Sequence, residues 1–234
     1  MSQLRNALLN AVAGRGFELR RHPAARRQRM FVAHGVDLVL DVGAADGGYG
    51  RTLRRFGYEG RIVSFEPLAA AYGRLSESIA ADPHWTARHH ALGDASGTAE
   101  INVASNSDSS SMLPMNESHR SAAPEVGYLG TETIRVETLD AVASEVLRDG
   151  DTAFLKIDTQ GFEKQVLAGA AGTLDRITGV QLELSFVSLY EGGMLIDEAV
   201  SLMYDAGFKL AVIEQGWASP TGAMLQSDGI FFRD

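Results

Sequence analysis

The sequence predicts an α/β fold built on a Rossmann-like, mostly parallel sheet, and three observations predict it. Short apolar runs alternate along the chain with segments of helical periodicity, as in a parallel sheet covered by helices. A glycine-rich turn at 43–48 follows the first apolar run. The last two apolar runs, 208–214 and 228–233, lie too close in sequence for a helix between them. We therefore expect the last strand to pair antiparallel.

Two helices are expected ahead of the first strand. Leu4, Leu8 and Val12 recur at helical spacing within 3–13, and Pro23 opens a second helix over 23–34. Residues 1–30 carry seven arginines and a single acid. We therefore divide the chain into a helical cap or interface segment, 1–35, and one domain, 36–234. The basic segment is interpreted as a solvated helix pair, an interface that forms a homodimer, or a lid over an anionic substrate.

The remaining elements follow in regular alternation. Buried strands are expected at 36–42, 61–66 and 153–158, further strands at 87–91 and 179–186, and helices at 48–56, 69–81, 139–147, 161–174 and 195–206. Exposed strands are expected at 98–104 and 133–138. The polar, aperiodic stretch 105–131 between them predicts a long loop of the kind that forms lids or binding loops.

Composition excludes several classes of protein. A net charge of −9 argues against a broad nucleic-acid-binding surface. The absence of cysteine excludes disulfides, thiolate zinc sites and a cysteine nucleophile. The sequence contains no apolar run of about eighteen residues, so no transmembrane helix is expected. The first residues do not read as a secretory signal, so we expect a cytoplasmic protein.

The turn after the first strand favours S-adenosylmethionine (SAM) over NAD. The dinucleotide-binding fingerprint has its middle glycine at the position of Ala45. The alanine side chain would hinder the close approach of the backbone to a pyrophosphate. SAM has no phosphate and is positively charged at sulfur, which suits Asp41 and Asp46 near the turn. Glu66, at the end of the second strand, offers two oxygens to the ribose hydroxyls. The alternative is a Rossmann-like turn that binds no ligand.

Seven motifs in order resemble the FkbM family of SAM-dependent methyltransferases over about residues 36–234. They are Leu40–Tyr49, Val63–Pro67, Ala91–Asp94, Asn106–Ser111, Thr138–Asp140, Phe154–Glu163 and Val166–Gly169. The resemblance implies the seven-stranded class I methyltransferase sheet and methyl transfer to a hydroxyl of a sugar or glycosylated small molecule. The chain departs from the family pattern twice, with Ala45-Asp46 where an asparagine is usual and Gln160 where a glutamate is usual.

The same resemblance implies which residues bind the cofactor. The methionine part would be lined by the first turn and the residues around it: Asp41, Gly43, Ala44, Ala45, Asp46 and Tyr49. Glu66 would hold the ribose, and the adenine would lie among Pro67, Leu68, Ala91, Leu92 and Asp94. Asp158 would face the sulfonium and the substrate.

A hydroxyl acceptor must lose its proton, so a general base or a metal is expected. His119, in the polar loop, is the first candidate base, and Asp158 is the second. Asp158 and Glu183, at the ends of neighbouring strands, are candidate oxygen ligands for Mg²⁺. The alternatives are that both acids bind substrate hydroxyls, that Glu183 pairs with Lys156, and that His119 is an exposed loop residue.

Three other functions remain open at the level of sequence. An N-methyltransferase of a small molecule would need no strong base. An NAD-linked oxidoreductase is disfavoured by Ala45 and by the lack of a convincing hydride-transfer pair such as Tyr-x-x-x-Lys. A non-catalytic SAM-binding domain is disfavoured by the presence of Asp41, Glu66 and Asp158 together.

Overall fold

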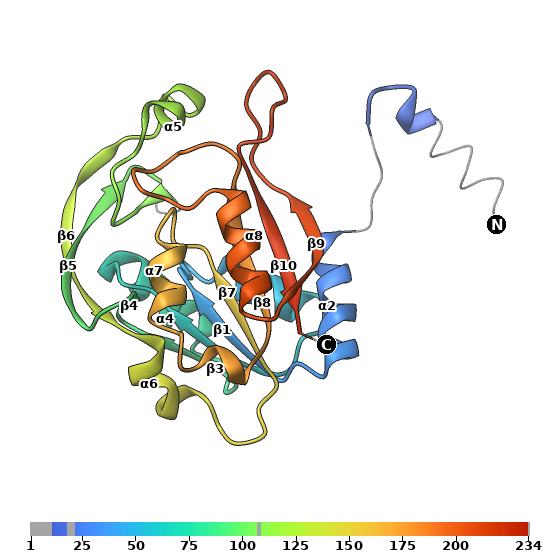
Figure 1. Ribbon diagram of the computed structural model, residues 1–234, viewed down its shortest axis with the longest axis vertical. Coiled ribbons are helices and arrows are strands. Elements are labelled where there is room, and N and C mark those ends of the chain that lie inside the picture. The colour runs from blue at the N-terminus through green and yellow to red at the C-terminus, as the bar shows by residue number, and fades with distance from the viewer. Residues whose placement is uncertain (1–10, 18–21, 107–108, 234) are drawn as a thin grey trace.

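A seven-stranded sheet forms the centre of the protein. The computed structural model describes residues 11–17, 22–106 and 109–233. The strand order is β3-β2-β1-β7-β8-β10-β9 (Figure 1). The bounds are β1 (Leu38–Val42), β2 (Arg61–Phe65), β3 (Trp85–Arg88), β7 (Ala153–Ile157), β8 (Ile177–Ser185), β9 (Lys209–Gln215) and β10 (Gln226–Phe232). β10 runs antiparallel to both neighbours and the other pairs are parallel, which confirms the predicted fold class.

Helices cover both faces of this sheet (Figure 1). They are α2 (Pro23–His34), α3 (Gly48–Arg55), α4 (Ala69–Ile79), α6 (Leu139–Val146), α7 (Glu163–Ala168) and α8 (Ile196–Asp205). Successive residues of a strand point to opposite faces, so Leu40 packs with α6, α7 and α8 while Val39 packs with α2, α3 and α4. Every residue of β1 and β7 is buried, as expected for parallel strands between two helical layers.

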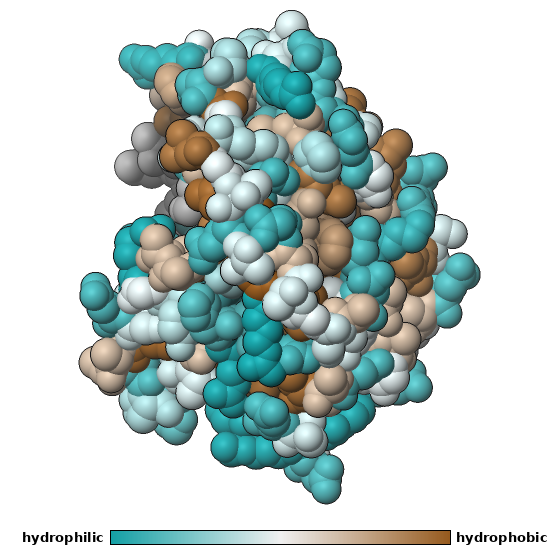
Figure 2. Space-filling model, turned by 90° about the vertical axis from the view of Figure 1, so that its left-hand side faces the viewer, coloured by the Kyte–Doolittle hydropathy of each residue, from teal (hydrophilic) through white to brown (hydrophobic). Residues whose placement is uncertain are grey.

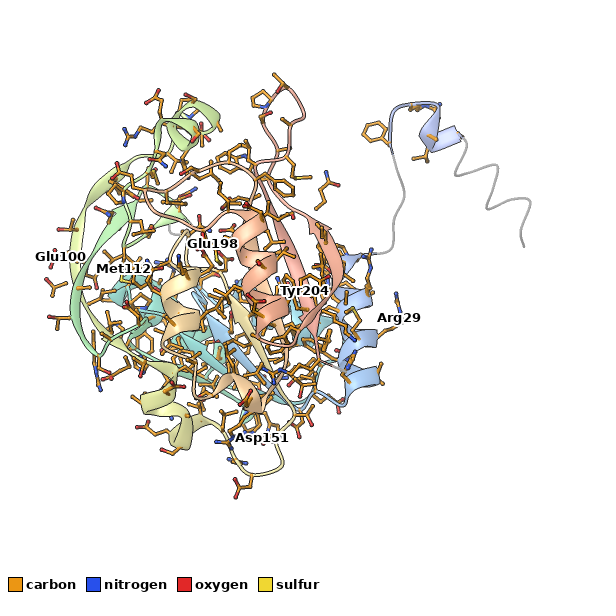
Figure 3. All side chains as sticks on the ribbon, in the orientation of Figure 1. Arg29, Glu100, Met112, Asp151, Glu198 and Tyr204 are labelled. Carbon is orange, nitrogen blue, oxygen red and sulfur yellow. The ribbon has the colours of Figure 1, made fainter. Side chains whose placement is uncertain are left out.

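A second, three-stranded sheet arches beside the first. Its order is β4-β6-β5, with β4 (Ala91–Leu92), β5 (Gly97–Ala104) and β6 (Tyr128–Glu137). Figure 2 shows that the face on this side of the molecule is largely hydrophilic, with small apolar patches between the polar side chains. In Figure 3, Glu100 lies on the outer side of this sheet and Met112 on the side facing the central sheet. The second sheet therefore presents an apolar inner surface to the main body.

Three expected elements differ from the structure. The expected loop 105–131 contains a helix, α5 (Glu117–Ala122), and β6 begins within it, because a single short helix leaves no periodic signal. The expected strand 87–91 is divided into β3 and β4. The expected helix 161–174 ends at Ala168 and is followed by a 3₁₀ turn at Leu174–Arg176. At Gly169 a Cβ would lie 1.8 Å from the carbonyl oxygen of Gly93, so this close approach ends the regular helix.

The second N-terminal helix packs onto the main body. α2 spans the predicted residues 23–34, and Phe31 is buried against the central sheet. The expected helix over 3–13 lies mostly outside the described residues. Its described part, 11–13, is helical. In the described part of the chain, no helix combines the length and apolar character needed to cross a membrane. The division at residue 35 stays a prediction.

Candidate functional site

A cleft of about 690 Å³, including its open mouth, lies at the carboxyl ends of β1, β2 and β7. Eight of the predicted cofactor residues line it: Gly43, Ala45, Glu66, Pro67, Leu68, Ala91, Leu92 and Asp158. They come from four separate segments that the parallel strand ends bring together. The cleft has an apolar end around Leu68, Leu92 and Ile101 and a polar end at Asp158.

The turn after β1 is shaped by close backbone contact with the end of β7. Gly43 has φ +72°, and a Cβ there would lie 1.9 Å from the carbonyl oxygen of Asp158. Glycine is therefore required both by conformation and by space. Ala45 also adopts a left-handed conformation, with φ +49°, which turns its N–H toward the Glu66 carboxylate. The turn leaves the cleft open at the point where a methionine tail would lie.

Glu66 is held in a fixed orientation at the centre of the cleft. Its Oε1 accepts a hydrogen bond from the N–H of Leu68 at 2.8 Å, and its Oε2 accepts one from the N–H of Ala45 at 2.8 Å. The residue is 4% exposed, and burial raises the pKa of its carboxyl to about 7. A carboxylate has about four lone-pair sites, so each oxygen keeps one for a ligand hydroxyl.

Asp41 lies behind the turn, outside the cleft lining. It is fully buried, and its Oδ1 lies 3.1 Å from the Nζ of Lys156. Lys156 also donates to the carbonyl oxygen of Gly43 at 2.9 Å and lies 3.7 Å from Asp158 Oδ2. Burial alone would lower the pKa of Lys156, but the charges of Asp41 and Asp158 outweigh it and raise the pKa. Asp41 thus anchors the lysine, and the lysine ties the turn to β7.

Gln160 joins two acids at the polar end of the cleft. Its Nε2 donates to Asp158 Oδ1 at 2.8 Å and to Glu183 Oε2 at 3.0 Å. Burial, together with the nearby charges of Asp158, Glu163 and Asp228, raises the pKa of Glu183 well above its usual range. Lys156 forms its ion pairs with Asp41 and Asp158, and Glu183 takes the amide as its partner.

The acid pair does not fit a Mg²⁺ site. Mg²⁺ requires near-octahedral oxygen coordination, whereas both carboxylates here are directed at an amide N–H donor. Within residues 11–17, 22–106 and 109–233, no group of three or more His, Asp or Glu side chains could hold a metal ion. No step of the chemistry below is therefore assigned to a metal.

His119 lies in a hydrophobic cluster and not in an open loop. It is on α5, is 2% exposed, and packs edge-to-face on Tyr190 and Trp217 with ring centroids 5.3 Å away in each case. Burial lowers the pKa of its imidazole. The residue is absent from the cleft lining, because α5 packs over the apolar residues around Tyr190.

Four other predicted cofactor residues also lie outside the cleft lining. Asp46 is exposed at the surface and pairs with Arg51 at 2.9 Å. Tyr49 donates its hydroxyl to Gln181 Oε1 at 3.1 Å on β8. Ala44 is buried in the core and Asp94 is exposed. Ala44 and Tyr49 therefore support the site from behind, while Asp46 faces solvent with Arg51.

Several lining residues are not among the predicted cofactor residues. Ile101 and Met112, from the second sheet and the segment after it, line the cleft together with Ser110, Thr159 and Gln160. Ser110 belongs to the polar stretch 105–131, which the sequence marked as a possible binding loop. The two apolar residues carried no functional signal, since nothing local indicates that the second sheet closes over the strand ends.

Comparison with known proteins identifies the family. A family model described as the methyltransferase FkbM domain matches residues 41–210. The 2-O-methyltransferase NoeI of Sinorhizobium fredii (strain NBRC 101917 / NGR234) is 25% identical over 173 residues, which cover 71% of this chain and 70% of that protein.

Two solved structures resemble the fold. A candidate O-methyltransferase from Klebsiella pneumoniae aligns with a TM-score of 0.53 at 9% identity, over 100% of this chain and 91% of that one. TehB from Haemophilus influenzae aligns with a TM-score of 0.50 at 8% identity, over 92% and 63% of the two chains. At such low identity these likenesses show the fold alone.

Proposed function

Because the chain belongs to the FkbM methyltransferase family, we propose that it transfers a methyl group from SAM to a hydroxyl of a sugar or glycosylated small molecule. The observation that carries the proposal is the position of Glu66 and Asp158 on one cleft, with apolar residues on one side of Glu66 and the Asp158 carboxylate at the opposite end. A nucleoside with a cationic tail presents an apolar base, ribose hydroxyls and a positive charge in the same order.

The cleft suits each part of the cofactor. Adenine would lie among the apolar residues Leu68, Leu92 and Ile101, and the ribose hydroxyls would bond to Glu66. The methionine tail would follow the Gly43 turn toward Asp158. When bound, SAM supplies a methyl group that is already electrophilic, so the protein's task is alignment, exclusion of water and removal of a proton.

We assign the base to Asp158. It lines the cleft, its side chain is 39% exposed, and Lys156 and Gln160 hold its two oxygens in place. Its carboxylate would accept the hydroxyl proton as the acceptor oxygen bonds to the methyl carbon, while the methyl–sulfur bond breaks and S-adenosylhomocysteine leaves with that electron pair. His119 is not given this role, because it is buried away from the lining.

Support for a hydroxyl acceptor comes from the relative NoeI, whose name states 2-O-methyl transfer. The saccharide and the homodimer formed through the N-terminal helices stay predictions. Transfer to nitrogen is the second candidate, and it would not require Asp158 as a base. Retained turnover in Asp158→Asn would favour this candidate.

The test is calorimetric titration with S-adenosylhomocysteine, with NAD in parallel. We expect saturable one-to-one binding of S-adenosylhomocysteine, none of NAD, and loss of binding in Glu66→Ala. Formation of S-adenosylhomocysteine from SAM is then followed with a panel of methyl glycosides. Binding of NAD alone, or normal affinity in Glu66→Ala, would refute the proposed cofactor site.

A further inference from the structure

The side chain of Gln160 is fixed by partners at both ends of its amide. The two N–H groups go to Asp158 Oδ1 and Glu183 Oε2, and Oε1 accepts the hydroxyl hydrogen of Tyr190 at 2.8 Å. Tyr190 is 1% exposed. This orientation of the amide satisfies all three partners, since carboxylate oxygens accept and the tyrosine hydroxyl donates.

The backbone around Gln160 is held as firmly as its side chain. Its φ is +56°, a left-handed value that is uncommon outside glycine, and its carbonyl oxygen accepts the hydroxyl hydrogen of Ser111 at 2.7 Å. Gly161 follows with φ +98°, where a Cβ would lie 2.8 Å from the Cβ of Tyr190. Strained backbone of this kind persists only where the surroundings enforce it.

Two carboxylates brought this close repel each other unless a positive charge or a shared donor lies between them. Lys156 reaches Asp158 on its far side, at Oδ2, and among the described residues it forms ion pairs with Asp41 and Asp158 but not with Glu183. The group between the two acids is the Gln160 amide. The amide therefore occupies the position between the two acids that a bridging cation would otherwise take.

We propose that Gln160 is a positioning residue that takes the place of a metal ion, holding Asp158 and Glu183 as one acceptor-binding pair. This inference rests on the proposed function, since it assigns the pair to the acceptor side of the same cleft. In this pair Asp158 faces the cleft and meets the acceptor, and Glu183, which is not among the cleft-lining residues, holds Asp158 in place through the Gln160 amide. The enzyme then works without a divalent metal.

The first test removes the amide while keeping its volume. In Gln160→Met we expect kcat to fall ~100-fold, the loss typical of a misplacement of about 1 Å, with KM for SAM changed less than ~2-fold. Gln165→Ala is the matched control, because its side-chain oxygen has no hydrogen-bond partner among the described residues. The methyl glycoside with the highest turnover serves as acceptor, and native turnover should withstand EDTA.

The second test does not depend on any acceptor. In Gln160→Glu a third carboxylate would face Asp158 and Glu183, so the variant should bind Mn²⁺ at least ~10-fold more tightly than the native chain, measured by electron paramagnetic resonance. Adding Asp158→Asn to this variant should remove the gain. The gain would show that the two acids converge on the amide position in solution.

The outcomes separate this inference from the proposed function. Native S-adenosylhomocysteine binding with unchanged kcat in Gln160→Met would overturn the positioning role and leave the methyltransferase assignment intact. Loss of native turnover in EDTA, or a folded Gln160→Glu that gains no Mn²⁺ affinity, would overturn it as well. Failure of the native chain to bind S-adenosylhomocysteine would instead refute the proposed function.

Discussion

The variant Glu66→Gln tests two properties of this buried carboxylate: the free-energy cost of burying its charge, and its contribution to ligand binding. In the folded chain, burial raises the pKa of Glu66 from 4.5 to about 7. The folded state therefore binds this proton more tightly than the unfolded state does. The resulting stabilisation is fully present below pH 4.5 and is lost as the pH rises through about 7. At ~1.4 kcal/mol for each pH unit, the loss amounts to about 3 kcal/mol.

Glutamine is neutral at every pH, so the variant lacks this dependence. Its amide also turns an N–H toward the N–H of Ala45 or Leu68, which costs about 1–3 kcal/mol at all pH values. The quantity to compare is therefore the change with pH and not the absolute stability. Between about pH 4.5 and pH 8, the free energy of unfolding of the native chain should fall by about 3 kcal/mol relative to the variant.

Urea unfolding followed by circular dichroism at both pH values gives these free energies. Other buried acids, such as Asp228 and Glu183, are common to both chains and cancel in the comparison. The variant should also bind S-adenosylhomocysteine more weakly, since one oxygen acceptor is lost. If the free energy of unfolding changes with pH in the same way in the native chain and the variant, the inference that burial raises the pKa of Glu66 is refuted.

Three further predictions follow from single contacts. Gly43→Ala should destabilise the fold by about 3 kcal/mol or more, because its Cβ would meet the Asp158 carbonyl in a left-handed turn; thermal unfolding measures this, and an unchanged melting temperature would contradict it. Arg27→Ala should cost about 3–5 kcal/mol in urea unfolding, because it leaves Glu214, its partner at 2.5 Å, buried and unpaired; a cost under about 1 kcal/mol would mean that water reaches the pair. His119→Phe should keep turnover, and as the pH falls below 6.5 the native chain should lose stability relative to this variant, since burial lowers the pKa of the histidine; lost turnover would return the base role to His119.

The sequence by itself determined the fold class and the part of the cleft to which we assign the cofactor. The turn at Gly43 and the acid at Glu66 directly follow two buried strands, and parallel strands bring their carboxyl ends to one edge. These residues are therefore placed by signals within a few positions of themselves. The antiparallel last strand was predictable for the same reason, from the short spacing between two apolar runs.

Tertiary structure decided the polar end of the cleft and the side that the second sheet closes. Which side chains meet there depends on packing between segments far apart in sequence, and local patterns do not encode it. His119 lies in a polar stretch, yet the short helix that carries it packs against Tyr190 and Trp217. Gln160 was visible as a departure from the family pattern, but its bonds to Asp158 and Glu183 required the register of β7 and β8.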